Sequence, residues 1–136
     1  ANAAAAKAQV AALDTELAAQ LLPAQGKPFV TYHDAYGYFT AHYGLTFAGA
    51  LAMGDASAAG AQHVQDMQET IAARAICVFP EAQHDSGLLL QLLDGTGAKL
   101  GAALDPVGST LPPSADSYSA LMRALASSLA GCLSGA

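Results

Sequence analysis

Positively charged residues are few in this sequence and they do not cluster. The chain has 136 residues, of which 5 are Lys or Arg and 11 are Asp or Glu, so its formal net charge is −6. Proteins that bind nucleic acids neutralise phosphates with grouped Lys and Arg side chains. The composition therefore argues against a nucleic-acid partner.

Long apolar runs are also missing. No stretch approaches the roughly 18 to 20 apolar residues that a membrane-spanning helix needs. Residues 1–6 lack the charged start and apolar stretch of a secretory signal peptide. We therefore expect no membrane-spanning helix, and a chain that is mature or trimmed.

Cysteine is scarce, with Cys77 and Cys132 far apart and no CxxC pair. In a reducing compartment two such residues are usually buried thiols, whereas in an oxidising compartment they can pair. A bridge between them would stabilise the fold by roughly 4 kcal/mol on the chain-entropy model. Counting cysteines leaves both alternatives open.

Apolar residues make up 53% of the chain, enough for one domain with a real core. Apolar residues at steps of three and four predict an amphipathic helix over residues 3–22, with Val10 on its packed side. Short apolar runs then alternate with helical patterns, which is typical of an α/β lobe with a parallel sheet between two helical layers. We expect four strands, at residues 28–32, 45–53, 76–79 and 99–104. Helices are expected at residues 34–43, from Ser57 or Gly60, from Asp85 or Ser86 to 93, and from Ser114 or Asp116 with Tyr118 facing inward.

Polar residues follow each predicted strand, where ligands of parallel sheets bind. They are His33 and Asp34, Gly54 and Asp55, Glu81, and Asp105. We expect His33, Glu81 and Asp105 to converge, giving one nitrogen donor and two carboxylates. Such a set suits either a divalent metal or acid–base chemistry, and spacing does not choose between them. Asp34 is more simply interpreted as the cap of the following helix.

Four segments resemble one protein family. They are FVTYHDAYGYFTAHYGL (29–45), ICVFPEAQ (76–83), LDPVGS (104–109) and SYSALMRALASSLAGCL (117–133). Together they are similar to the zinc-binding proteins of bacterial ABC importers, the ZnuA type. That resemblance implies two lobes joined by a long helix, with residues 1–24 as the end of this helix. Residues 25–136 would be the C-terminal metal-binding lobe, and the N-terminal lobe would be absent.

The resemblance also implies roles for individual residues. His33 matches the zinc ligand of the C-terminal lobe, and Asp105 an optional or outer ligand. Glu81 matches a position beside the ligands, where it would orient the histidine. Manganese-binding relatives place a carboxylate at the position of His33, so a histidine there favours zinc. Cys77 and Cys132 match a pair that forms a disulfide. His84, close to Glu81 in sequence, is an accessory zinc contact at most.

The expected function is therefore capture of zinc in the periplasm and its delivery to the membrane permease of an ABC importer, without enzymatic activity. With one or two ligands, the lobe alone should bind zinc weakly and is open to self-association. One alternative is a manganese- or iron-binding lobe of the same family. The other is a small α/β enzyme or receiver-like module that uses Asp34, Glu81 and Asp105.

Overall fold

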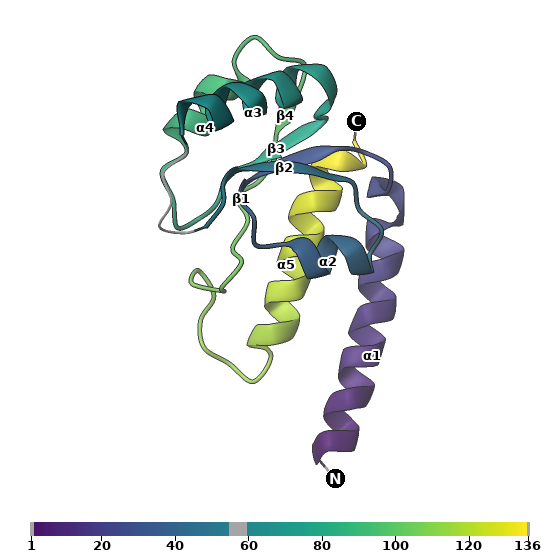
Figure 1. Ribbon diagram of the computed structural model, residues 1–136. Coiled ribbons are helices and arrows are strands. Elements are labelled where there is room, and N and C mark those ends of the chain that lie inside the picture. Colours follow the sequence, from purple (N-terminus) through teal and green to yellow (C-terminus); the bar gives the residue numbers. More distant parts are fainter. Residues whose placement is uncertain (1, 55–59, 136) are drawn as a thin grey trace.

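A four-stranded parallel sheet forms the centre of the protein (Figure 1). The computed structural model describes residues 2–54 and 60–135. The strands follow the order β2-β1-β3-β4 across the sheet, and every neighbouring pair is parallel. They comprise β1 (Phe29–His33), β2 (Phe47–Ala52), β3 (Cys77–Phe79) and β4 (Lys99–Leu100).

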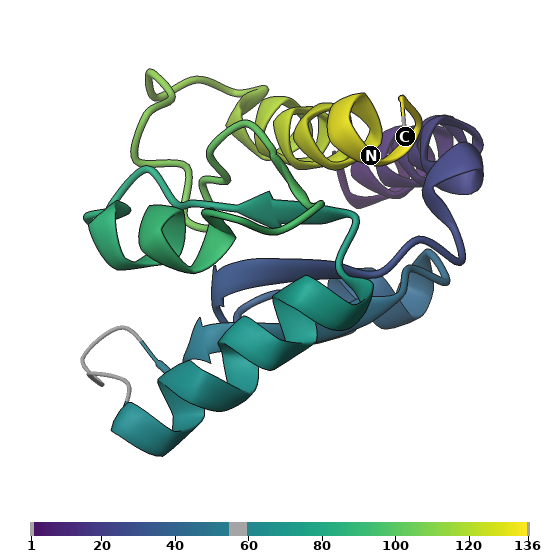
Figure 2. The same ribbon diagram turned by 90° about the horizontal axis from the view of Figure 1, so that it is seen from above.

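Helices cover both faces of this sheet, so the predicted three-layer α/β lobe is confirmed. α1 and α5 lie on one side of the sheet and α3 on the other (Figure 2). Buried residues of α4 belong to the same core cluster as those of α3. The helices are α1 (Asn2–Leu21) with a 3-10 turn at Leu22–Ala24, α2 (Gly37–His42), α3 (Ala61–Arg74), α4 (Gly87–Leu93) and α5 (Ser117–Leu133). Asp55 and Ser57, named above as candidates, lie outside the described residues.

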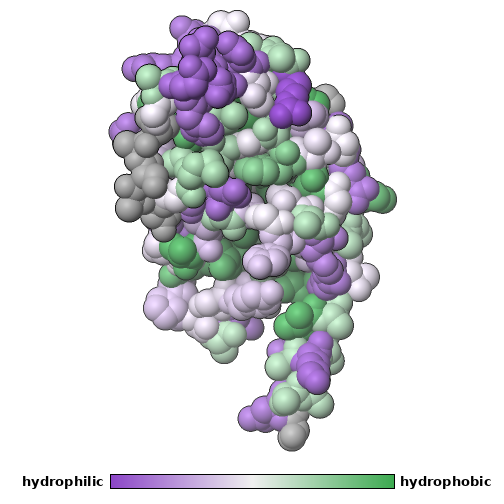
Figure 3. Space-filling view, viewed as in Figure 1, coloured by the Kyte–Doolittle hydropathy of each residue, from purple (hydrophilic) through white to green (hydrophobic). Residues whose placement is uncertain are grey.

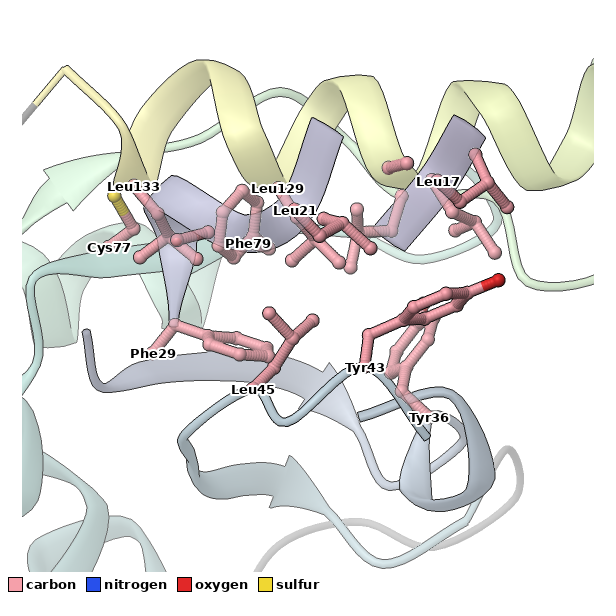
Figure 4. Close-up of a cluster of buried hydrophobic side chains, with 14 of the residues drawn as sticks. Leu17, Leu21, Phe29, Tyr36, Tyr43, Leu45, Cys77, Phe79, Leu129 and Leu133 are labelled. Carbon is pink, nitrogen blue, oxygen red and sulfur yellow. The ribbon is translucent and has the colours of Figure 1, made fainter. Parts of the chain in front are cut away.

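Alternating side chains of the short strands supply the two halves of the core. Phe29 and Phe79 face α1 and α5, where their rings meet edge to face at 5.7 Å (Figure 4). Val30 and Val78 face the opposite way, against α3 and α4. Successive strand residues point to opposite faces. β2 and β3 are therefore continuous apolar runs, as expected for a parallel sheet covered on both sides.

A disulfide joins the sheet to the last helix. Cys77 in β3 is bonded to Cys132 near the end of α5, with their Cα atoms 6.3 Å apart. The pairing implied by the family resemblance is therefore confirmed. It closes a covalent loop that includes α4, β4 and most of α5.

Polar contacts attach α2 to α1. Asp14 on α1 contacts His42 Nε2 at 2.7 Å and accepts a hydrogen bond from the Tyr43 hydroxyl at 3.0 Å. These two hydrogen bonds lower the pKa of Asp14, and the bond with His42 has the larger effect. Burial, with the Asp14 contact, raises the pKa of Tyr43 to about 12. The short α2 is thereby held beside the longer helix.

The expected start and cap of α2 and the expected end of β4 were wrong. α2 begins at Gly37, after an N-cap at Tyr36, so Asp34 does not cap it. The Asp34 N–H instead bonds to the Ala52 carbonyl, which continues the β1–β2 pairing. β4 ends at Leu100, and strand-like pairing returns only as an isolated bridge at Leu104.

Two residues expected to face inward are half exposed, Val10 at 48% and Tyr118 at 54%. The first half of α1 projects beyond the body of the protein (Figure 1), and polar and apolar side chains are mixed on it (Figure 3). An open groove of about 990 Å³ lies between α1, α2 and α5, and Val10, Tyr38 and Tyr118 line it. Within the described residues, no helix combines the length and apolarity that crossing a bilayer requires.

Candidate metal centre

The sheet topology brings the ends of β1 and β3 together. β2 lies on one side of β1 and β3 on the other, so the strand order reverses direction at β1. Ligands of open α/β sheets bind at such a reversal, beyond the carboxyl ends of the strands. Thr31 pairs with Phe79 in the register of β1 and β3. Two residues further along each chain, this register places His33 beside Glu81.

His33 and Glu81 form a buried pair. The Nδ1 atom of His33 lies 2.5 Å from Oε2 of Glu81. Only 7% of His33 and 3% of Glu81 are exposed. The Tyr36 hydroxyl donates to the other carboxylate oxygen, Oε1, at 2.6 Å. Each carboxylate oxygen thus has a hydrogen-bond partner, which a buried carboxylate requires.

This pairing gives the imidazole of His33 an orientation in which it could bind a metal. When a carboxylate accepts a hydrogen bond from Nδ1–H, the ring adopts the tautomer with its lone pair on Nε2. Histidines that ligate metals almost always donate their other ring N–H to a carboxylate, a carbonyl or water. Glu81 therefore has the geometry of the orienting group that the family resemblance implied.

A second histidine lies at the same site. His84 Nε2 is 3.7 Å from Glu81 Oε2, and the His84 ring stacks on Tyr32 with centroids 4.4 Å apart. One ligand atom from each of His33, Glu81 and His84 lies within 4.8 Å of the other two. Sequence reasoning gave His84 only an accessory role. The signal that was present is the EAQH segment, in which a short turn returns the histidine toward Glu81.

Asp105 organises its own loop instead of joining this cluster. Its Oδ1 accepts from Gln83 Nε2 at 2.5 Å and from the Ser109 N–H at 3.1 Å. Its Oδ2 accepts from the Thr110 N–H at 2.8 Å and the Thr110 hydroxyl at 2.7 Å. These four bonds match the roughly four lone-pair sites of a carboxylate. A direct bond from Asp105 to a metal would therefore displace one of them.

The same contacts set the charge of Asp105. Burial alone would raise its pKa, but the hydrogen bonds from Thr110, Gln83 and Ser109 together outweigh burial and hold the pKa well below its usual range. The side chain is therefore a carboxylate at any physiological pH. Within residues 2–54 and 60–135, Asp34 and Asp105 do not join Glu81 in a cluster of three ligand groups.

Comparison with known proteins identifies the family. A family model described as ZnuA, the periplasmic component A of the zinc-uptake complex, matches residues 1–132. The chain belongs to the ZnuA family. Members of this family are periplasmic transport components and not enzymes, which agrees with the expectation from the sequence.

Individual relatives of this ZnuA-family chain bear the name high-affinity zinc uptake system protein ZnuA. The protein of Paracoccus denitrificans is 48% identical over 134 residues, covering 98% of this chain and 41% of the relative. That of Brucella suis is 42% identical over 124 residues, covering 90% of this chain and 37% of the relative. The chain therefore spans about two fifths of the length of these curated relatives.

Solved structures share the fold. The periplasmic zinc-binding protein TroA of Treponema pallidum superposes with a TM-score of 0.82 at 25% identity, over 95% of this chain and 50% of that protein. A crystal structure of ZnuA superposes with a TM-score of 0.75 at 25% identity, over 95% of this chain and 47% of that one. In each case this chain matches about one half of the solved chain.

Proposed function

We propose that this chain is one lobe of a periplasmic zinc-binding protein, which captures zinc as cargo and delivers it to the membrane permease of an ABC importer. The observation that carries the proposal is the buried His33–Glu81 pair at the reversal of strand order. Its imidazole is oriented by a carboxylate, as metal-ligating histidines are. Family membership supplies the transport context.

The proposed organisation has residues 1–24 as the end of an inter-lobe helix and residues 25–136 as the C-terminal lobe. Two features support it. α1 has no buried residue before Leu13, so its first half packs little against the rest of the described protein. The apolar groove between α1, α2 and α5 offers a surface that a second lobe would cover. Without that lobe, the groove is the surface through which this chain would self-associate.

Zinc is the proposed cargo because the donor atom of His33 is an imidazole nitrogen. Imidazole suits zinc and its neighbours, whereas sets made only of carboxylates and carbonyls suit manganese and calcium. Asp105 is proposed as an outer ligand that acts through water, since its oxygens already accept four hydrogen bonds. Competition of manganese(II) and iron(II) against zinc tests this preference directly.

The test is replacement of His33 by alanine. We expect His33→Ala to lower zinc affinity by more than about 100-fold, because even residues that only orient a ligand contribute roughly 10- to 100-fold. Affinity is measured by competition against a zinc-binding dye. His42→Ala is the matched control, since His42 lies on the surface of α2 with its ring 60% exposed. Unchanged affinity in His33→Ala would remove His33 from the site.

A further inference from the structure

The Tyr36 hydroxyl binds the Glu81 carboxylate on the oxygen that His33 does not use. It donates to Oε1 at 2.6 Å, while Nδ1 of His33 lies 2.5 Å from Oε2. Tyr36 is 4% exposed, so water has little access to this contact. Hydroxyl-to-carboxylate bonds of about 2.5 to 2.7 Å are charge-assisted and roughly twice as strong as bonds between neutral groups. The hydroxyl is therefore a strong restraint on the position of the carboxylate.

Backbone and core contacts hold Tyr36 in place independently of the carboxylate. The chain bends after β1, where the Ala35 N–H donates to the His33 carbonyl at 3.1 Å. The Tyr36 carbonyl then accepts from the Thr40 N–H at 2.9 Å, in the first turn of α2. The Tyr36 ring belongs to the buried cluster that also contains residues of α1 and α5 (Figure 4). Because side chains in close-packed cores keep well-defined rotamers, this packing sets where the hydroxyl lies.

A second imidazole lies within reach of the same carboxylate. Nε2 of His84 is 3.7 Å from Oε2 of Glu81, the oxygen that contacts His33. Stacking on Tyr32, with ring centroids 4.4 Å apart, keeps the His84 ring there. The last torsion angle of a glutamate side chain is broad, so a carboxylate held by one hydrogen bond can still turn. With Tyr36 bound to Oε1, the carboxylate is held at both oxygens and stays with His33.

We propose that Tyr36 is a positioning residue for the candidate metal centre, and that its hydroxyl holds the Glu81 carboxylate against Nδ1 of His33. The inference rests on the proposed function, in which His33 binds zinc through Nε2. A carboxylate fixed beside Nδ1–H selects the tautomer with its lone pair on Nε2, and zinc binds that lone pair. Tyr36 thus acts on metal affinity without touching the metal.

The test uses Tyr36→Phe in the 136-residue chain, because this change removes the hydroxyl and keeps the ring in the core. Tyr43→Phe is the matched control at the end of α2, where the hydroxyl donates to Asp14 at 3.0 Å. Glu81→Gln shows the effect of losing the carboxylate itself. Circular dichroism reports whether each variant is folded at the temperature of the measurements.

The first readout is the tautomer of His33 in the metal-free chain. Nitrogen NMR of chains with ¹⁵N-labelled histidine distinguishes a protonated ring nitrogen from one with a lone pair. The measurement is made at about pH 8, where an ordinary imidazole is neutral, and His33→Ala identifies the His33 signals by their loss. We expect the proton on Nδ1 in the unmodified chain and in Tyr43→Phe. In Tyr36→Phe part of the population should carry it on Nε2, and an unchanged tautomer overturns the proposal.

The second readout is zinc affinity, followed at the His33 ring signals while zinc is added to the same samples. We expect Tyr36→Phe to lower affinity about 3- to 10-fold, less than the roughly 10- to 100-fold that loss of a direct orienting partner costs. Tyr43→Phe should bind like the unmodified chain. A tautomer change without a loss of affinity, or a loss without a tautomer change, overturns the proposal. An equal loss in Tyr43→Phe also overturns it, because the effect would then come from the packing of α2.

A double variant shows whether Tyr36 acts through Glu81. Residues that share one hydrogen-bond network have non-additive effects, whereas independent residues have effects that add. If the hydroxyl works only by holding the carboxylate, Tyr36→Phe combined with Glu81→Gln should lose no more zinc affinity than Glu81→Gln alone. A loss in the double variant that equals the sum of the two single losses, in free energy, overturns the proposal.

Failure of this inference is distinguishable from failure of the proposed function. If His33→Ala loses zinc while Tyr36→Phe matches the unmodified chain in both readouts, the role of Tyr36 is refuted and the proposed function stands. If His33→Ala binds zinc normally, the proposed function fails at His33, and the role of Tyr36 in metal binding fails with it. The tautomer comparison needs no metal, so it still reports whether Tyr36 orients the ring.

Discussion

Reduction of the Cys77–Cys132 disulfide should be the largest single perturbation of stability in this lobe. The bond joins residues 55 apart in sequence and fixes α5 to β3. On the chain-entropy model, closing a loop of this length lowers the entropy of the unfolded chain enough to stabilise the fold by about 4 kcal/mol at 25 °C. Whole domains are stable by only about 5 to 15 kcal/mol. The reduced protein should therefore be marginal.

The measurement is urea unfolding of the metal-free chain, oxidised and reduced, followed by circular dichroism. For a slope of about 2 kcal/mol per molar urea, a change of about 4 kcal/mol moves the midpoint down by roughly 2 M. Comparing two redox states of one sequence avoids the cavity that Cys77→Ala would leave, since Cys77 is fully buried. A variant of the partly buried partner, Cys132→Ser, should unfold like the reduced chain.

A midpoint shift below about 0.5 M urea would refute this reasoning, because it corresponds to only about 1 kcal/mol. The bond would then constrain neither the unfolded chain nor the position of α5. The same comparison bears on localisation. A lobe that gains about 4 kcal/mol from this disulfide is more stable in an oxidising compartment, such as the periplasm, than in a reducing one.

Two further predictions concern packing and charge. Gly101→Ala should destabilise the fold by about 1 to 3 kcal/mol and lower Tm by roughly 3 to 10 °C, because its Cβ would overlap the buried ring of Phe79. The Cβ added in Gly97→Ala would meet no atom within 4 Å, so this variant should keep the Tm of the unmodified chain. Equal Tm values for the two variants would refute the clash at Gly101. Asp105→Asn should cost about 1 kcal/mol at neutral pH by weakening the bonds from Thr110. Since the pKa of Asp105 is lowered in the folded state, its carboxylate contributes fully to stability above about pH 4. This contribution is lost as the pH falls further. A stability difference between Asp105→Asn and the unmodified chain that does not change with pH would contradict this explanation.

The layers of the fold could be predicted because each element carries its own periodicity. The run that became β3 is apolar at every position and bounded by Pro80, so only a strand buried on both faces fits it. The end of β4 could not be predicted from its apolar run. Pro80 lies opposite this segment and has no N–H to donate, so the ladder stops and resumes only at Leu104.

The part of the candidate site that lies at the ends of strands could be predicted from the sequence. The register that pairs Thr31 with Phe79 brings His33 to Glu81, and a parallel sheet implies a register of this kind. The contribution of His84 depends on the path of a three-residue turn, which no periodicity reports. Asp105 was expected at the cluster because it follows the last predicted strand. Its loop turns the carboxylate onto the loop's own N–H groups instead.

One face of the sheet is apolar at the start of the strands and polar at their carboxyl ends. The apolar residues pack in the core, whereas the polar residues form the candidate metal centre. On the face toward α5, β1 presents Phe29, then Thr31, then His33. On the neighbouring strand Phe79 is followed on the same face by Glu81. An apolar pair there would cost no desolvation, and replacing buried charged groups by apolar ones is often neutral or stabilising. Stability therefore does not explain a buried carboxylate beside an imidazole at the carboxyl end of the sheet, whereas the proposed binding of a cation would.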